Sequence, residues 1–420
     1  MVYVISKSGK PLMPCENVIA RLLLKNGKAK VKKKCPFTIQ LTYDSTEYVQ
    51  DVTLGQDTGS KHVGTACVGN DKALYQSQIE LRDDIKSKMD SRRQARRLRR
   101  NRKTRYRKAR FLNRKNSTKF DRLSPSVKHK CQAHIDEIEF CKSILPISKI
   151  VLEVSQFDTV LMKNPVLINE KVRHWGYQKG FDYGFASRRE AILHRDNYTC
   201  QICGRKHVRL EVHHIIFRSQ GGTDDETNLI TLCEDCHSGI HDGTIVLNKK
   251  PKKMNLKYAT YMSIIRSQLL KKYPDAIETF GFVTKANREN LDLLKDHYID
   301  ACVIASSGQE FELNDEIFYK RRVAKGDYQL TKGVCGEQKI PTGKIQGFRK
   351  FDKVKYLGKE YFIKGRMSSG FGILMDIFNK KIDFSDKPKG WKTPKLSNMT
   401  RLQASGSILC ISQRIILSIA

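Results

Sequence analysis

The chain has 420 residues, which is too long for one compact core and favours two to four domains. Its 78 Lys and Arg residues outnumber 44 Asp and Glu residues and give a net charge of +34. A nucleic acid is the partner that best neutralises such an excess, and an acidic membrane surface is the alternative. No stretch of 18 or more apolar residues exists, which excludes a membrane-spanning helix. The start, MVYVISKSGKPLMP, is not a signal peptide because charge follows a short apolar run.

The first part of the chain predicts strands. Residues 1–50 contain two β-rich runs, VYVIS and FTIQLTY, around a basic hinge, KNGKAKVKKK, and predict a small N-terminal module. From residue 51, DVTLGQDTGSKHVGTACV predicts a strand, a tight turn that contains glycine and a second strand. A further apolar strand is expected over residues 148–154.

Residues 91–115 form a basic run, with 14 Arg or Lys residues among 25 and no acidic residue. The run contains good helix formers and no Gly or Pro, so it predicts a helix of up to roughly 38 Å. The alternative is a disordered basic tail. Such a helix would bind the nucleic-acid backbone through Arg–phosphate pairs, with little reading of sequence. The candidate residues are Arg92, Arg93, Arg96, Arg97, Arg99, Arg100, Arg102, Arg105, Arg107 and Arg110.

Later segments alternate between helix and strand. Residues 258–273 and 286–306 carry helical periodicity. From about residue 309 the chain is rich in Gly, Lys and aromatic residues, with strand-like runs such as EYFIKG. The last residues, SILCISQRIILSIA, either close a small sheet or mark a truncated domain.

Four of the twelve cysteines form two Cys-x-x-Cys pairs that are separated by 29 residues. Four thiolates are the ligand set of a closed structural zinc site. The candidate ligands are Cys200, Cys203, Cys233 and Cys236. The other eight cysteines are scattered singly, which favours reduced thiols over a disulfide framework.

The loop between the pairs holds Leu-Glu-Val-His213-His214-Ile-Ile and Asn228, and His237 and His241 follow. Over residues 186–245 the sequence resembles the HNH endonuclease family, which has a ββα-metal core. Adjacent residues on a strand point to opposite faces, so His213 and His214 cannot share one role. The resemblance implies that His213, His237 and His241 bind the catalytic metal, that His214 is the general base, and that Asn228 holds the loop near it. The alternative is a zinc-binding fold without catalysis, which would not need the double histidine.

Four further residues lie far apart in similar settings: Asp57 and Glu153 end strands, and His297 and Asp300 share a helix face. This order resembles a split RuvC nuclease, an RNase H-like sheet in which carboxylates from separate segments bind two metal ions. Paired ions can activate water and stabilise the leaving oxygen.

Two neighbours of Asp57 depart from the family pattern. Gln56 occupies a usually apolar place, and Thr58 replaces a common proline. Strand alternation turns Gln56 away from Asp57, so the departure is expected to weaken packing and to leave the ligand intact.

Taken with Lys10-Pro-Leu-Met-Pro14, the whole order resembles the IscB family of transposon-encoded RNA-guided DNA endonucleases, over at least residues 1–308. The implied fold is α/β and multidomain: an RNase H-like split RuvC core with an inserted HNH domain, an arginine-rich bridge helix and small N- and C-terminal β-rich modules. The implied domains are 1–50 (N-terminal), 51–80, 124–185 and 246–308 (RuvC parts), 81–123 (bridge helix), 186–245 (HNH) and 309–420 (target interaction).

The resemblance also implies a function. HNH would cut the DNA strand paired to a long structured guide RNA, and RuvC would cut the displaced strand of the double-stranded target. The implied cofactors are Mg²⁺ or Mn²⁺ at both nuclease sites and a structural Zn²⁺. The implied protein is a monomer within a ribonucleoprotein, cytoplasmic and associated with a prokaryotic nucleoid. Two alternatives stay open: a protein-only HNH endonuclease of the restriction or homing type, and a nucleic-acid-binding regulator that does not cleave.

Overall fold

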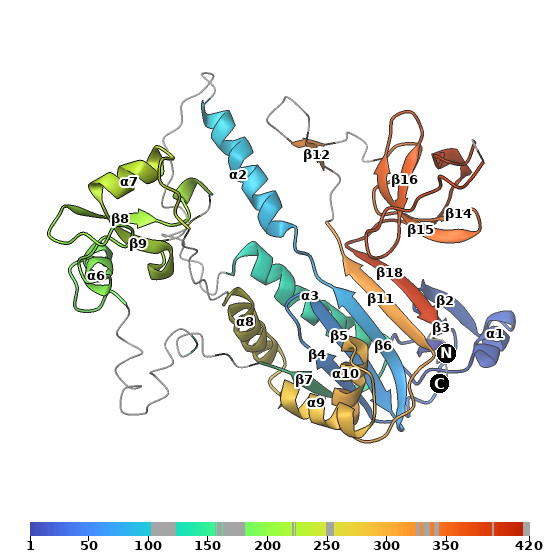
Figure 1. Ribbon diagram of the computed structural model, residues 1–420. Helices are drawn as coiled ribbons and strands as arrows, with labels where there is room; N and C mark the ends of the chain where they lie inside the picture. Colours follow the sequence, from blue (N-terminus) through green and yellow to red (C-terminus); the bar gives the residue numbers. More distant parts are fainter. Residues whose placement is uncertain are drawn as a thin grey trace. The chain divides into compact units, whose positions relative to one another are not determined.

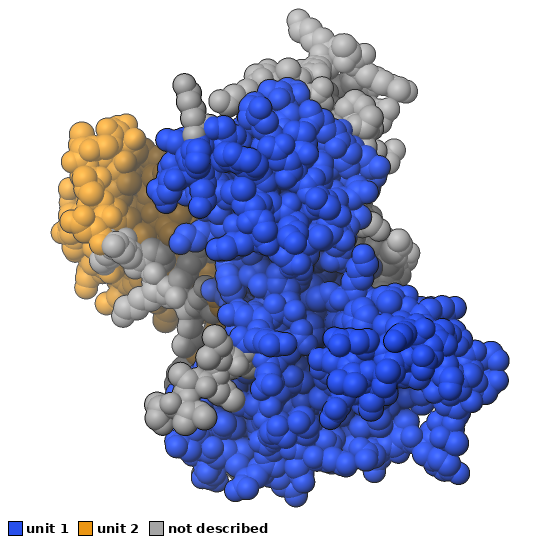
Figure 2. Space-filling model, turned by 90° about the vertical axis from the view of Figure 1, so that its right-hand side faces the viewer, with its two compact units in different colours: residues 1–156, 261–420 blue, residues 157–260 orange. Residues whose placement is uncertain are grey.

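The structure is a computed structural model that describes residues 1–101, 123–155, 157, 162, 181–220, 222, 224–248, 256–324, 328–330, 337–339, 344–388 and 390–414. The chain divides into two compact units (Figure 2). Residues 1–156 and 261–420 form the sheet unit, and residues 157–260 form the cysteine–histidine unit. None of the helices in the described ranges is both long and apolar enough to cross a membrane.

A seven-stranded mixed sheet forms the centre of the sheet unit (Figure 1), in the order β10-β7-β4-β5-β6-β11-β18. The neighbours β4, β5 and β6 are antiparallel, β7 runs parallel to β4, and β10 runs parallel to β7. The strand β11 runs parallel to β6, and β18 closes the far edge antiparallel to β11. The bounds are β4 Val52–Asp57, β5 His62–Gly69, β6 Lys72–Glu80, β7 Ile147–Glu153, β10 Ile277–Thr279, β11 Glu316–Arg322 and β18 Ile408–Arg414.

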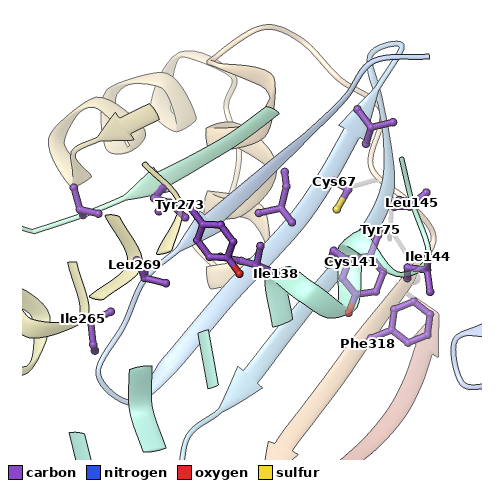
Figure 3. Close-up of a cluster of buried hydrophobic side chains, with 14 of the residues drawn as sticks. Cys67, Tyr75, Ile138, Cys141, Ile144, Leu145, Ile265, Leu269, Tyr273 and Phe318 are labelled. Carbon is purple, nitrogen blue, oxygen red and sulfur yellow. The ribbon is translucent and has the colours of Figure 1, made fainter. Parts of the chain in front are cut away.

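Helices α3 (Pro125–Lys142) and α8 (Lys257–Lys272) pack against one face of this sheet. Ile138 of α3 and Leu269 of α8 join the core that Cys67 and Tyr75 line from the strands (Figure 3). The same face buries a charge: Glu137 of α3 accepts hydrogen bonds from the Tyr75 and Ser77 hydroxyls and from the Lys320 ammonium, at 2.7 to 2.9 Å. A buried carboxylate with all these donors is paired and adds specificity to the packing.

Helix α10 (His297–Ser306) covers the opposite face of β4 and β5, and two glycines allow it to approach closely. A Cβ atom added at Gly55 would collide with the carbonyl oxygen of Ala301, and one added at Gly64 with that of His297. Only glycine fits where two backbones lie this near. The two positions therefore fix the height of α10 above the strands.

The N-terminal module contains the two expected strands, β1 (Tyr3–Ile5) and β3 (Phe37–Leu41), and a helix, α1 (Asn17–Lys25). The interpretation of the basic segment as a hinge was wrong, because Ala29–Lys34 forms strand β2, antiparallel to β3. Its lysines lie on an edge strand of the β1-β3-β2 sheet, where charged side chains are tolerated because they reach water.

The cysteine–histidine unit is built around a β-hairpin of β8 (Leu210–His214) and β9 (Leu229–Cys233). Helix α6 (Arg188–Arg195) precedes the hairpin, and helix α7 (Glu234–His241) follows it directly. Both helices contact both strands.

The region after residue 309 is rich in strands, as expected. Four of them form a separate antiparallel sheet: β14 Lys353–Tyr356, β15 Lys359–Arg366, β16 Gly372–Met375 and β17 Thr400–Gln403. A short hairpin is formed by β12 (Tyr328–Leu330) and β13 (Glu337–Lys339). Two alternatives were open for the tail, a strand that closes a small sheet or a truncated domain; within it, Ile408–Arg414 forms β18 at the edge of the seven-stranded sheet.

Two helix predictions also need correction. The expected helix over 286–306 is two helices, α9 (Gly281–Asn290) and α10, because Asp292 has a left-handed φ of 52° and Asp296 caps α10. The basic helix α2 (Ile85–Asn101) begins before the basic run, and residues 102–122 lie outside the described part of the chain. Helix α3 carries polar residues on most sides and was not expected from periodicity.

A Gly64→Ala variant tests the close approach of α10. The added methyl group must push α10 away from the sheet, so we expect the free energy of unfolding of the sheet unit to fall by about 3 kcal/mol. Gly365→Ala on β15 is the matched control, because its Cβ would meet Ile373 at ordinary van der Waals distance. Equal unfolding midpoints for both variants in a denaturant titration would contradict the packing described.

Candidate active sites

The β8–β9 hairpin separates its two adjacent histidines. His213 is buried, and its ring lies 5.0 Å from that of His237 and 5.2 Å from that of His241, centroid to centroid. His214 instead directs Nε2 to a carboxylate oxygen of Asp224, 2.8 Å away. The two neighbours therefore face different groups, as strand alternation predicts.

Helix α7 supplies the rest of a three-histidine cluster. His237 and His241 lie one turn apart, with ring centroids 4.7 Å from each other. One ring nitrogen from each of His213, His237 and His241 lies within 4.8 Å of the others, a spacing that could hold a metal ion. The Nδ1 atom of His237 contacts a carboxylate oxygen of Glu211 at 2.8 Å, which orients Nε2 towards the cluster. Glu211 lies two residues before His213 on the same face of β8.

The environment of His213 suits a metal ligand. Burial, followed by the nearby His237 and His241, lowers the pKa of His213 to about 4, so the ring is neutral at pH 7. Its Nε2 atom is buried and finds no hydrogen-bond partner among the described residues. A neutral imidazole nitrogen with no partner costs free energy unless something binds it, and a cation would do so.

Asn228 ties the end of the hairpin to the loop after β8. It is fully buried, its Oδ1 accepts from the amide of Ile216 at 2.9 Å, and its Nδ2 donates to the carbonyl of Ile216 at 3.1 Å. Gly222 lies against the same loop, where an added Cβ would collide with the carbonyl oxygen of Ile216. These contacts hold the backbone next to His214 in place.

The four cysteines of the two pairs also come together. Their sulfur atoms all lie within 4.8 Å of one another, and this cluster suggests zinc binding. Burial raises the pKa of the Cys200 thiol, but backbone N–H groups of Cys203, Cys233 and Ile202 outweigh it and lower the pKa to about 6. The cluster clamps the turn before β8 to the start of α7, because Cys233 caps that helix.

In the sheet unit, the neighbouring parallel strands β4 and β7 end side by side. Asp57 and Glu153 are register partners at these ends. The hydroxyl of Thr58 donates to the carbonyl of Glu153 at 2.6 Å and joins the two strand ends. Burial, followed by the negative charge of Asp57, raises the pKa of Glu153 to about 7. Two adjacent carboxyls resist ionising together, which is relieved by a bound cation.

Helix α10 brings His297 into contact with Asp57, and Asp300 lies close enough for the charge of Asp57 to act on it. The Nδ1 atom of His297 lies 2.6 Å from a carboxylate oxygen of Asp57. Asp300 lies one turn further along α10, and its carboxylate accepts from Arg288 of α9 at 2.6 Å, in a buried pair. Burial and the negative charge of Asp57 together raise the pKa of Asp300, although Arg288 and His297 act to lower it. These four residues do not appear among the tight metal-ligand groups that the described residues form.

Gln56 faces away from Asp57, as expected, and is fully buried. Its Nε2 donates to the Thr65 hydroxyl and to the His134 carbonyl, both at 3.3 Å, while its Oε1 finds no partner among the described residues. The hydrogen bonds of Nε2 therefore offset part of the free energy that is lost by burying the polar amide of Gln56 in place of an apolar side chain.

The comparisons with known proteins fall on these two regions. A family model described as HNH endonuclease matches residues 200–243, which include both hairpin strands, all four cysteines and the three-histidine cluster. The chain carries an HNH endonuclease domain. That domain makes the protein a metal-dependent DNA nuclease. A second family model, described as RRXRR protein, matches residues 2–180, a range that includes Asp57, the basic run and Glu153.

Two curated proteins are similar to short parts of the chain. Anaredoxin of Nostoc sp. is 29% identical over 66 residues, which cover 16% of this chain and 87% of that protein. The type IV methyl-directed restriction enzyme EcoKMcrA of Escherichia coli is 36% identical over 58 residues, which cover 12% of this chain and 21% of the enzyme. The chain therefore matches only about a fifth of that restriction enzyme.

Sequence reasoning missed three side chains around these sites: Glu211, Asp224 and Arg288. Glu211 was predictable, because it lies two residues before His213 in a strand and therefore shares a face with it. Asp224 and Arg288 were not, because both come from loops or helices whose approach depends on the fold. The basic helix was found, and Arg92, Arg93, Arg96 and Arg97 are exposed on α2. The backbone of α2 includes Arg99 and Arg100, and Arg102, Arg105, Arg107 and Arg110 lie outside the described residues.

Removing one thiol tests the zinc cluster of the HNH domain. In Cys236→Ser we expect bound zinc, measured by mass spectrometry of the metal, to fall to near zero. The domain should then unfold, because structural zinc contributes about 10 kcal/mol to such small modules. Cys15→Ser, outside the cluster, should retain the zinc. Full zinc binding by Cys236→Ser would contradict the assignment.

The raised pKa of Glu153 predicts that replacing its carboxyl group by the amide of glutamine stabilises the fold, and that the effect depends on pH. A carboxyl whose pKa rises on folding weakens the fold as the pH increases from about 4.5 to about 7. Without added divalent cations, Glu153→Gln should therefore stabilise the chain by about 2 kcal/mol at pH 8 and by little at pH 4.5. Glu310→Gln, at an exposed position, is the control. If Glu153→Gln instead lowered the stability at pH 8 in a denaturant titration, the ionised carboxylate of Glu153 would not be unfavourable in the folded chain.

Proposed function

We propose that the chain is an RNA-guided DNA endonuclease with two cutting sites: the HNH domain for the guide-paired strand and a RuvC-like site for the displaced strand. The observation that carries the proposal is the contact between segments 240 residues apart, in which His297 lies 2.6 Å from Asp57. Glu153 ends the adjacent parallel strand. A second cluster of acids and a histidine, separate from the HNH domain, supports a second site of the split RuvC kind.

In the HNH site, His214 is the proposed general base. Asp224 is ionised, since hydrogen bonds from His214 and Arg218 lower its pKa, and it accepts a hydrogen bond from Nε2 of His214. The proton on Nε2 leaves the lone pair of the neutral ring on Nδ1, which is the atom proposed to take a proton from the attacking water. Asn228 holds the loop that follows His214.

His213, His237 and His241 fit a divalent cation, Mg²⁺ or Mn²⁺, because their nitrogens converge and Nε2 of His213 is buried without a partner among the described residues. Such a cation, when bound, stabilises charge on the phosphate oxygens. Glu211 keeps His237 in the orientation that this role needs.

In the RuvC-like site, Asp57, Glu153, His297 and Asp300 are the proposed residues, with Mg²⁺ or Mn²⁺ as the cofactor. The donor set fits because two carboxyls lie at adjacent strand ends and one resists ionising, which a cation would reverse. His297, hydrogen-bonded to Asp57, orients that carboxylate. Arg288 donates to one carboxylate oxygen of Asp300 and is proposed to orient this fourth residue.

The charge of the chain supports a nucleic-acid complex. The net charge is +34, and α2 alone exposes Arg92, Arg93, Arg96 and Arg97. A helix of this kind binds phosphates of any sequence, so target choice is proposed to come from base pairing with a long structured guide RNA. The N-terminal and C-terminal modules resemble the IscB arrangement in order along the chain.

The similarity to EcoKMcrA favours a second candidate, a protein-only endonuclease of the restriction type. That enzyme is described as methyl-directed, and such a protein would recognise DNA without RNA. Purification of the full chain from its native host decides between the two. A long RNA that survives a high-salt wash supports guidance, and a chain that cuts DNA after complete RNase treatment supports the restriction type.

Single substitutions should separate the two cuts. On a target with each strand labelled, His214→Ala should abolish cutting of the guide-paired strand, and Asp57→Ala should abolish cutting of the displaced strand. Each loss should exceed about 100-fold, the usual contribution of a general base or of a metal ligand.

Two control variants should leave both cuts intact. His207→Asn keeps a residue that tolerates the left-handed backbone at φ 56°, and Asp51→Asn changes the exposed residue just before β4. If either active-site change abolished both cuts while RNA binding survived, the chain would have one site and not two.

A further inference from the structure

Two phenylalanine rings lie exposed beside the RuvC-like site. Phe280 precedes α9 and Phe282 belongs to its first turn, and their rings are parallel within 6°, with centroids 6.0 Å apart. This separation lies in the range of about 4.5 to 7 Å for stacked aromatic pairs, so the two rings form one apolar stack. Phe282 is 73% exposed and Phe280 38% exposed.

The chain topology places this surface at the carboxylates. The short strand β10 is the register partner of β7, with Thr279 opposite Glu153, so both strands end at the same edge. The next residues are Phe280, Gly281 and Phe282. An added Cβ at Gly281 would lie 3.1 Å from a carboxylate oxygen of Glu153. The two phenylalanines are therefore the sequence neighbours of a backbone position that lies close to Glu153.

A cation lies on the same helix face as the open ring. Lys285 follows Phe282 by three residues, and residues at this spacing are neighbours on a helix. Its side chain is 66% exposed and is 3.7 Å from Glu289, an exposed pair that contributes little. An aromatic face for a base next to a lysine for a phosphate is the combination by which proteins bind single strands.

We propose that Phe280 and Phe282 form a stacking platform for the bases of single-stranded DNA that enters the Asp57–Glu153 site, and that Lys285 holds the adjoining phosphate. The inference rests on the proposed function, because it names how the displaced strand is held there. A single strand is the occupant that fits. Its bases are unpaired and can stack on a ring of any sequence context, whereas a duplex hides the faces of its bases.

The geometry also relates the stacked base to the place where the DNA strand would be cut. Gly281 lies between the two phenylalanines in sequence, and a Cβ added there would lie 3.1 Å from a carboxylate oxygen of Glu153. A base stacked on Phe282 therefore places a phosphate of its own nucleotide or of the next one near the carboxylates. The platform fixes where the strand is cut, and it adds affinity without reading sequence.

Photocrosslinking tests the platform without requiring cleavage. The full wild-type chain, without added Mg²⁺ or Mn²⁺, is irradiated with a single-stranded oligonucleotide that contains 5-iodouracil, and the crosslinked peptides are mapped by mass spectrometry. We expect a crosslink within residues 280–282 whose yield falls about 10-fold in Phe282→Ala and is kept in Phe282→Trp. Phe378→Ala is the matched control, since Phe378 is 62% exposed elsewhere in the sheet unit.

Two outcomes would overturn the platform. One is a set of crosslinks that never falls on residues 280–282. The other is self-association of the wild-type chain that Phe282→Ala abolishes, measured by sedimentation, because the rings would then be an interface between two copies.

Cleavage rates provide the second readout. On the strand-labelled target, Phe282→Ala should slow the cut of the displaced strand about 10-fold and leave the HNH cut unchanged, which also reports correct folding. Equal slowing of both cuts would overturn the platform. A chain that crosslinks at Phe282 yet never cuts the displaced strand would contradict the proposed function and still support the platform.

Discussion

The sheet unit depends on the close contact between α10 and the glycines of β4 and β5. Gly55 and Gly64 remove the side chains that would hold the helix away, so its backbone rests on the strands. This contact sets the position of His297, whose ring then reaches Asp57. The helix comes from residues 297–306 and the strands from residues 52–69, so a loss of packing here would separate the proposed site into pieces.

The two candidate sites are built in different ways. The HNH domain is local: its hairpin and helix are consecutive, and the four cysteines clamp them. The proposed RuvC-like site draws on three distant segments, and its carboxyls repel one another in a way that the neutral rings of the HNH site do not. Its carboxyls lie near one another, and burial raises the pKa of Glu153 to about 7. In the HNH site, neutral rings converge, and burial keeps His213 neutral. A bound cation would stabilise both arrangements, as proposed above.

This difference explains what the sequence could predict. The roles proposed for His213, His214, His237 and His241 follow from a short motif, since strand alternation and the helical turn fix where each side chain points. The strands that end in Asp57 and Glu153 were also predictable. Three features were not: the pairing of Asp300 with Arg288, the orientation of His214 by Asp224, and the pairing of the C-terminal strand with β11. The first two depend on how the chain folds back over 10 to 12 residues, and the third joins segments about 90 residues apart, so hydrophobic periodicity predicts none of them.

The central claim is that the chain holds two separate cation sites of nuclease type. Anomalous X-ray scattering from crystals of the full chain grown with Mn²⁺ tests it most directly. We expect manganese within bonding distance of His213, His237 and His241, and further manganese between Asp57 and Glu153. Manganese at the histidines alone, with Asp57 still bound to His297 and Asp300 still bound to Arg288, would contradict the claim and leave the chain with a single nuclease site.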